Sequence, residues 1–243
     1  PRGEILAVAG VQGNGQTELA EVILGLLTPD SGVIRLEDAD ITRAKPRESL
    51  DAGVGFIPED RSTDGIIASF SIADNLVLDQ FRSSSFSAAG SLKHGAIARN
   101  AREKEKEYDI RLTSIEDPVS SLSGGNQQKV VVAREMSRDL TLLVANQPTR
   151  GVDVGSIEFI HRRIVDVRDQ GCAVLLISSE LDEVVSLADR IAVMYRGRIV
   201  GIVPADTGRD VLGLMMAGVP LDEAMAASSG TSRDAEASRK EEQ

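Results

Sequence analysis

The stretch "ILAVAGVQGNGQTELAEVILGLL", residues 5–27, places a glycine-rich turn between two apolar runs. The first run, Ile5 to Ala9, is continuous and has the length of a strand. The run after the turn is apolar on nearly all sides, as a buried helix would be. A strand, a glycine loop and a helix in this order are the context that a phosphate-binding loop requires. The stretch therefore predicts a strand–loop–helix unit of that kind.

The turn "GVQGNGQT" keeps the spacing of a phosphate-binding loop but not its charge. The pattern is G-x-x-x-x-G-K-[ST], in which backbone N–H groups surround the phosphates, the lysine contacts the β- and γ-phosphates, and the hydroxyl contacts Mg²⁺. Gly10, Gly15 and Thr17 match, and Gln16 stands at the lysine position. Three interpretations are open at this point: a chance glycine turn, a nucleotide site without turnover, or an ATPase whose chemistry lies elsewhere.

Composition excludes several classes of protein. The 243 residues suffice for one large α/β domain with a buried core. A net charge of −11, 3% aromatic residues and no Trp argue against a nucleic-acid binder. The single cysteine, Cys172, rules out an internal disulfide framework and lies in an apolar run where a thiol is ordinary core.

No apolar run approaches the roughly 20 residues that cross a bilayer, and no secretory signal is visible. We therefore expect a soluble, cytosolic chain that meets a membrane only through a partner. The first residue is Pro1 rather than Met, a few residues before a strand. We expect a fragment of a longer polypeptide.

Beyond residue 27 the sequence predicts strands that alternate with helices. "SGVIRLEDADI" is typical of a hairpin at a sheet edge, and "GVGFI" (Gly53 to Ile57) of a short strand. Helical patterns begin near Ser71, and the stretch from Ser83 to Ser91 is typical of a flexible turn or loop between helices. The buried face of a later helix is marked by Ile157, Ile160, Ile164 and Val167. The alternation indicates a mainly parallel sheet with helices on both sides, whose ligands bind beyond the carboxyl ends of the strands.

Two stretches in the second half carry the most specific signal. "SLSGGNQQKVVVAREM" (121–136) resembles the LSGGQ signature of ATP-binding cassette (ABC) proteins, with Asn126 ahead of Gln127. "LTLLVANQPTRGVDVGS" (140–156) resembles that family's Walker B strand and D-loop. Ser123 can cap the helix that follows it while the first amides of that helix point at an anion. Taken alone, the motif is also compatible with an ordinary serine-capped helix.

The resemblance extends to about Leu221 and is closest to the second, C-terminal cassette of tandem ATPase subunits in bacterial importers for simple sugars and nucleosides. It rests on "GEILAVAGVQGNGQTEL", "FIPEDRSTDGI", "QPTRGVDVGSIEFIHRR" and "ISSELDEV". It implies an α/β fold with a P-loop (RecA-like) ABC ATPase core, a small antiparallel β subdomain and an inserted α-helical subdomain.

The resemblance also implies a division of the chain. We expect an ABC nucleotide-binding domain over residues 1–225, with its helical insertion at about 71–138, and a disordered tail over 226–243, which lacks apolar residues to bury. Only nine residues precede Gly10 and none is aromatic, so the family's N-terminal strands and adenine-stacking loop are expected to be missing.

By this resemblance, ATP and Mg²⁺ are the expected cofactors. Mg²⁺ is assigned, weakly, to Thr17, Glu59 and Asn146, while Gln147 and Ser179 take the positions of the catalytic base and the switch residue. The expected cofactor-binding residues, whether for this cassette's own nucleotide or its partner's, are Gly10, Gly13, Asn14, Gly15, Gln16, Thr17, Glu59, Ser123, Gly124, Gly125, Asn126 and Asp153.

Four of these positions have lost the side chain that the family uses. Gln16 in place of lysine removes a charge-assisted contact of about 1.5 to 3 kcal/mol. Asn146, where an Asp supports Mg²⁺, offers a hard dication no charge. Gln147, in place of Glu, can orient water but cannot take its proton. Ser179 stands where the switch histidine is expected, and Glu59 stands near the Q-loop glutamine.

The groups that a cassette lends to its partner are intact: Ser123, Gly124, Gly125 and Asp153. We therefore predict a cassette that has lost hydrolysis at its own P-loop and completes the site of a second, catalytically competent cassette. The expected setting is the cytoplasmic face of the inner membrane, on transmembrane permease subunits, with a solute-binding protein met only indirectly.

Several alternatives stay open. The chain could be an active ATPase with compensating residues, a non-enzymatic dimerisation module that takes no nucleotide at its own P-loop, or a soluble cassette protein of DNA repair or translation. The acidic balance, the lack of zinc-binding cysteines and the "PEDR" and "SSELDEV" blocks count against the last. We expect His94 and His161 to be solvated, and no metal other than Mg²⁺.

Overall fold

The structure is a computed structural model that describes residues 1–228. Its centre is a six-stranded sheet in the order β10-β9-β1-β8-β7-β4. Neighbouring strands are parallel except β10, which lies antiparallel to β9 at one edge. The strands are β1 (Ile5–Ala9), β4 (Val54–Ile57), β7 (Leu142–Asn146), β8 (Ala173–Ser178), β9 (Arg190–Tyr195) and β10 (Arg198–Pro204). The predicted parallel α/β sheet is confirmed.

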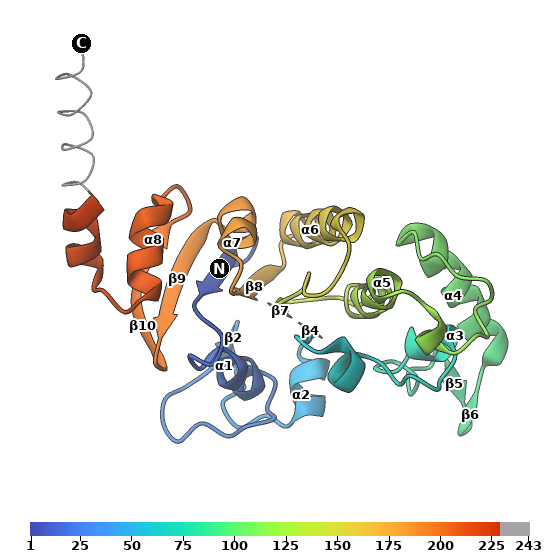
Figure 1. Cartoon of the computed structure of the whole chain (residues 1–243). Helices are drawn as coiled ribbons and strands as arrows, with labels where there is room; N and C mark the ends of the chain where they lie inside the picture. Colours follow the sequence, from blue (N-terminus) through green and yellow to red (C-terminus); the bar gives the residue numbers. More distant parts are fainter. Residues whose placement is uncertain (229–243) are drawn as a thin grey trace, which may run out of the picture.

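Helices cover both faces of this sheet, as predicted. In Figure 1, α6, α7 and α8 lie on one face, and α1 and α2 lie on the other. The α-helices are α1 (Gln16–Ile23), α2 (Pro46–Asp51), α3 (Ile72–Asn75), α4 (His94–Glu107), α5 (Gly124–Glu135), α6 (Val154–Asp169), α7 (Leu181–Leu187) and α8 (Arg209–Met216). In α6, Ile160 and Ile164 are fully buried, which confirms the face predicted from their spacing.

Residues 58–140 lie beyond the β4 edge, where Figure 1 shows α3, α4 and a small hairpin far from β10. Short helices lead into this part: a π-helical turn over Arg61–Gly65 and a 3₁₀ turn over Val119–Ser121. The end of α5 is tied back to the sheet, because Glu135 accepts the N–H of Phe56 in β4 at 3.1 Å. That anchor fixes the start of α5, the signature turn, relative to the sheet.

Two hairpins differ from what the sequence indicates. The "SGVIRLEDADI" hairpin, β2 (Arg35–Leu36) with β3 (Ala39–Asp40), forms its own two-stranded sheet rather than an edge of the large one. The segment expected as a flexible turn or loop consists largely of turns, and it also contains a second hairpin, β5 (Ser87–Ala88) with β6 (Ser91–Leu92). Short strands of two residues carry too little hydrophobic pattern to be recognised.

The helix after the glycine loop is shorter and less buried than its composition indicates. It ends at Ile23, because Gly25 has a φ of +75°, and the next two leucines, Leu26 and Leu27, are exposed. Near the other end of the chain, residues 221–228 are helical and Ala224 is fully buried, so the first three residues of the expected tail are ordered. The rest of that tail lies outside the described residues.

Among residues 1–228, no helix has the length and apolar character needed to cross a bilayer.

Cys172 gives a simple test of this packing. The thiol is buried just before β8, and burial raises its pKa to about 11. At about pH 8 the group is therefore a thiol rather than the reactive thiolate. We expect iodoacetamide to label the native chain at least about 100-fold more slowly than the chain in denaturant. Equal rates in the two conditions would show that the residue is not buried.

Candidate functional site

The glycine loop joins β1 to α1 at the carboxyl end of the sheet. Its backbone requires glycine at two positions, because Gly13 and Gly15 have φ values of +86° and +104°. A methyl group added to Gly10 would lie 2.6 Å from the Gln16 Nε2 atom and 2.6 Å from the Met194 carbonyl. The loop therefore has the tight backbone that the sequence predicted.

The side chain of Gln16 is folded back into this loop. Its Oε1 atom accepts the N–H of Asn14 at 3.0 Å, and its Nε2 donates to the carbonyl of Val11 at 3.1 Å. The side chain is buried, with 7% of its surface exposed. One of the loop amides that could bind a phosphate is thereby satisfied by the protein itself.

Two of the predicted site residues meet at the ends of neighbouring strands. Gln147 follows β7 with a φ of +50°, and its Nε2 donates to the Ser179 hydroxyl at 3.1 Å. Asn146, the last residue of β7, is buried with 3% of its surface exposed. The structure thus brings the base position and the switch position together, but the contact joins an amide and a hydroxyl, neither of which is basic near pH 7.

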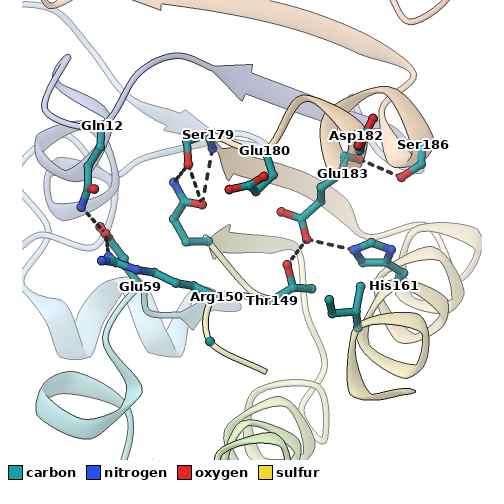
Figure 2. A pocket seen from close by; sticks show the side chains of 13 residues that line it. Gln12, Glu59, Thr149, Arg150, His161, Ser179, Glu180, Asp182, Glu183 and Ser186 are labelled. Atoms are coloured by element: carbon teal, nitrogen blue, oxygen red, sulfur yellow. Dashed lines mark hydrogen bonds and ion pairs between the residues drawn. The ribbon is translucent and has the colours of Figure 1, made fainter. Parts of the chain in front are cut away.

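Glu59 lies across from the glycine loop and is already paired. Its carboxylate accepts from Gln12 Nε2 at 2.6 Å and forms an ion pair with Arg150 (Figure 2). The expected Mg²⁺ set of Thr17, Glu59 and Asn146 therefore offers one carboxylate whose charge Arg150 balances. Over residues 1–228 there is no group of three or more acidic, His or Cys side chains that could hold a metal. These residues therefore fit a divalent cation poorly.

The pocket beside these residues has a volume of about 680 Å³ and extends toward α6 and α7. Glu183 of α7 is buried there and accepts from Thr149 Oγ1 at 2.7 Å, with His161 Nε2 at 2.9 Å on the same oxygen (Figure 2). The expectation that His161 is solvated is only partly correct, because its side chain is half-buried and its Nε2 atom contacts the Glu183 carboxylate. The sequence block "SSELDEV" contains Glu183 but gave no sign that it would pair with a residue of α6.

The signature turn forms a second, separate surface. Ser123 caps α5, and its hydroxyl accepts from the backbone N–H of Asn126 at 3.5 Å and from its Nδ2 at 3.0 Å. Asn126 in turn accepts the N–H of Arg111 at 2.8 Å. Within residues 1–228, Ser123 is the only side chain that accepts a hydrogen bond from the first backbone amides of α5. This leaves a helix N-terminus able to face an anion.

The loop with Asp153 packs directly against this turn. Asp153 caps α6 by accepting the N–H of Ser156 at 3.0 Å and its hydroxyl at 2.8 Å. These hydrogen bonds hold the pKa of Asp153 below its usual range, and the bond from the Ser156 hydroxyl has the larger effect. A methyl group added to Gly125 would overlap both Asp153 Oδ2 and Ser156 Oγ. Glycine is therefore required at this position by the closeness of the D-loop.

The structure thus divides the predicted residues into two groups. One group comprises the glycine loop, Glu59, Gln147 and Ser179, and it borders the larger pocket. A pocket of about 370 Å³ lies beside the other group, and it is lined by Ser123, Asn126 and Asp153 together with charged residues of α5 and α6. Sequence reasoning overlooked Arg61, whose guanidinium lies between the two groups, although the block "PEDR" was recognised as part of the pattern.

Comparisons with known proteins identify relatives of this chain. A relative from Lactococcus lactis subsp. cremoris (strain MG1363), the nucleoside import ATP-binding protein NupA, is 47% identical over 91% of this chain and 44% of its own length. The guanosine import ATP-binding protein NupO of Bacillus subtilis (strain 168) is 46% identical over the same shares. The chain therefore spans less than half the length of these relatives.

The fold matches solved structures as well. An ATP-binding cassette seen as a dimer in a post-hydrolysis state, bound to ADP and Pi, aligns with a TM-score of 0.72 at 19% identity, over 86% of this chain and 88% of that one. This likeness shows the α/β fold of ABC cassettes. The model of the family described as ABC transporter matches residues 1–150, which include the glycine loop and the signature turn. The chain belongs to the ABC transporter family.

Proposed function

We propose that the chain is the nucleotide-binding domain of a bacterial ABC importer for nucleosides or simple sugars. It takes part in coupling ATP binding and hydrolysis to uptake, at the cytoplasmic face of the inner membrane and through permease subunits. The names of the relatives support this substrate class, and nucleosides come first among them. The chain spans 44% of each relative's length, the share that one of two fused cassettes would take.

We infer further that this is the degenerate, C-terminal cassette of a tandem pair. It completes the site of a catalytically competent partner with its signature surface. The observation that carries this proposal is the contrast between its two surfaces. At its own site Gln16 fills part of the phosphate loop and Gln147 pairs with Ser179. At the signature turn, Ser123 and Asp153 both keep their caps. Mg²⁺ would then act with ATP at the partner's P-loop.

A dimerisation module without nucleotide chemistry is the second candidate. The internal hydrogen bonds of Gln16 favour it, since they occupy the loop amide that ATP would need. The two candidates differ in whether ATP turnover in the assembled transporter depends on Ser123.

The test compares two substitutions in the assembled transporter. Ser123→Arg places a bulky side chain over the amides offered to the partner, so we expect ATP turnover to fall about 100-fold. Thr17→Ala removes the only hydroxyl of this cassette's own phosphate loop, and we expect turnover to stay within about threefold. Equal losses would indicate that this cassette hydrolyses ATP itself. No loss with Ser123→Arg would contradict the lent signature and favour the module.

A further inference from the structure

The two charged residues that flank Asp60 in the sequence both contact the same short segment of the chain. Glu59 and Arg61 both contact residues 150–151, which connect β7 to the cap of α6. Asp60 holds the turn between them, because its carboxylate accepts the N–H groups of Ser62 at 2.9 Å and Thr63 at 3.3 Å. The backbone from which the Glu59 and Arg61 side chains extend is therefore held in one conformation.

Arg61 binds the backbone of this segment. Its NH1 donates to the carbonyl of Arg150 at 3.0 Å and its NH2 to that of Gly151 at 3.3 Å. Gly151 has a φ of +67°, so its carbonyl is presented in a conformation that favours glycine. The Nε atom of Arg61 is buried and has no hydrogen-bond partner within residues 1–228. The NH1 and NH2 contacts with two successive carbonyls are charge-assisted and therefore stronger than neutral hydrogen bonds.

Glu59 binds the side chain of the same segment. Its carboxylate forms an ion pair with the guanidinium of Arg150 and accepts a hydrogen bond from the Nε2 atom of Gln12, a residue of the glycine loop. The degenerate nucleotide site is thus joined to the segment before Asp153 by protein groups alone.

The segment and Arg61 lie directly under the signature turn. A methyl group added to Gly124 would come within 2.5 Å of Arg61 NH2 and 3.4 Å of the Gly151 carbonyl. One residue further on, a methyl group added to Gly125 would overlap Asp153 Oδ2 and Ser156 Oγ. Gly124 therefore packs close to Arg61 and Gly151, and Gly125 packs close to Asp153, which follows residues 150–151. The guanidinium also adds positive charge beneath the N-terminus of α5, the end of the helix that favours anions.

We propose that Glu59 and Arg61 are positioning residues that clamp residues 150–151 and so hold the signature turn and Asp153 in the geometry the partner's nucleotide needs. The clamp rests on the proposed function in one respect only, that the signature surface faces the partner's ATP. It gives this cassette a way to keep that surface in place without a nucleotide of its own.

The first experiment tests the clamp in the chain itself, without a partner. Arg61→Ala and Arg61→Lys are compared with the unaltered chain by hydrogen–deuterium exchange. The control is Arg190→Ala, which removes an arginine that pairs with Glu4 at the amino end of the parallel strands, away from the glycine loop. We expect peptides covering 148–156 and 121–127 to exchange about tenfold faster in Arg61→Ala, with a smaller increase in Arg61→Lys, since one contact is worth about a factor of ten. Unchanged exchange in both variants would overturn the clamp.

The second experiment tests its consequence in the assembled transporter. We expect Arg61→Ala to raise the KM for ATP about tenfold with kcat changed less than about threefold, because the partner's nucleotide loses a positioned surface. Arg61→Lys should recover part of this loss, and Arg190→Ala should change neither constant. A merely structural role would lower the amount of active protein, and so kcat, instead.

The Ser123→Arg variant separates the two ideas. If it abolishes turnover while Arg61→Ala leaves KM unchanged, the signature surface is used but the clamp does not serve it. If Ser123→Arg has no effect, the proposed function fails, whereas the exchange result still decides whether the clamp exists.

Discussion

Replacing Gly125 with alanine is expected to lower ATP turnover in the assembled transporter by about 100-fold. The added methyl group would overlap Asp153 Oδ2 and Ser156 Oγ, neither of which is the end of a long flexible side chain. The D-loop cap and the start of α5 must therefore move apart. A displacement of about 1 Å in groups that position a reacting phosphate costs about two orders of magnitude in rate.

Gly95→Ala is the matched control for this variant. Like Gly125, Gly95 is the second residue of an α-helix, but a methyl group added there meets no atom within 4 Å. Alanine in an open helical position stabilises by about 0.4 to 1 kcal/mol, so this variant should unfold at the same or a slightly higher temperature and keep full turnover. Thermal unfolding of Gly125→Ala, followed by circular dichroism, shows whether the chain still folds. A folded Gly125→Ala variant with normal turnover would contradict the proposed contact with the partner's site.

The sequence predicted the fold because its signals are local. The run from Ile5 to Ala9 is apolar without interruption, as the central strand of a parallel sheet requires, and Ile160 and Ile164 lie at helical spacing. The glycine loop and the Ser123 cap were also predictable, because each depends on residues that are neighbours in the chain. Short hairpins such as β2–β3 escaped because two residues are too few to show a period.

The interior of the site could not be predicted in the same way. The fold brings Arg61 to Gly151, and Glu183 to His161, from segments that lie 90 and 22 residues apart in the sequence. Nothing in a pattern of residue types fixes which charged side chain meets which carbonyl. The sequence shows that Gln16 stands where the P-loop pattern has lysine, but the hydrogen bond between its side chain and the Asn14 amide is apparent only in the structure. A lost charge and a blocked amide have different consequences for nucleotide binding.

Gln16→Lys is therefore expected to strengthen ATP binding to this chain by about 10- to 100-fold. Lysine adds a charge-assisted contact to the phosphates worth about 1.5 to 3 kcal/mol. It can still donate to the Val11 carbonyl, but it cannot accept the Asn14 N–H, so that amide becomes free for a phosphate. Isothermal titration with ATP and Mg²⁺, carried to millimolar nucleotide, measures the change.

Gln16→Ala separates the two parts of this effect. It frees the Asn14 amide without adding a charge, so we expect it to strengthen binding by less than about tenfold. Equal affinities for the alanine and lysine variants would mean that the blocked amide alone weakens the site. If neither variant binds ATP, the loop is a structural remnant. Neither variant should hydrolyse ATP, because Gln147 still cannot take a proton from water.

Turnover at this loop is expected only when Gln147→Glu and Asn146→Asp are added to Gln16→Lys and a partner's signature is present. This triple variant tests the roles of Asn146, the last residue of β7, and of Gln147, which follows it.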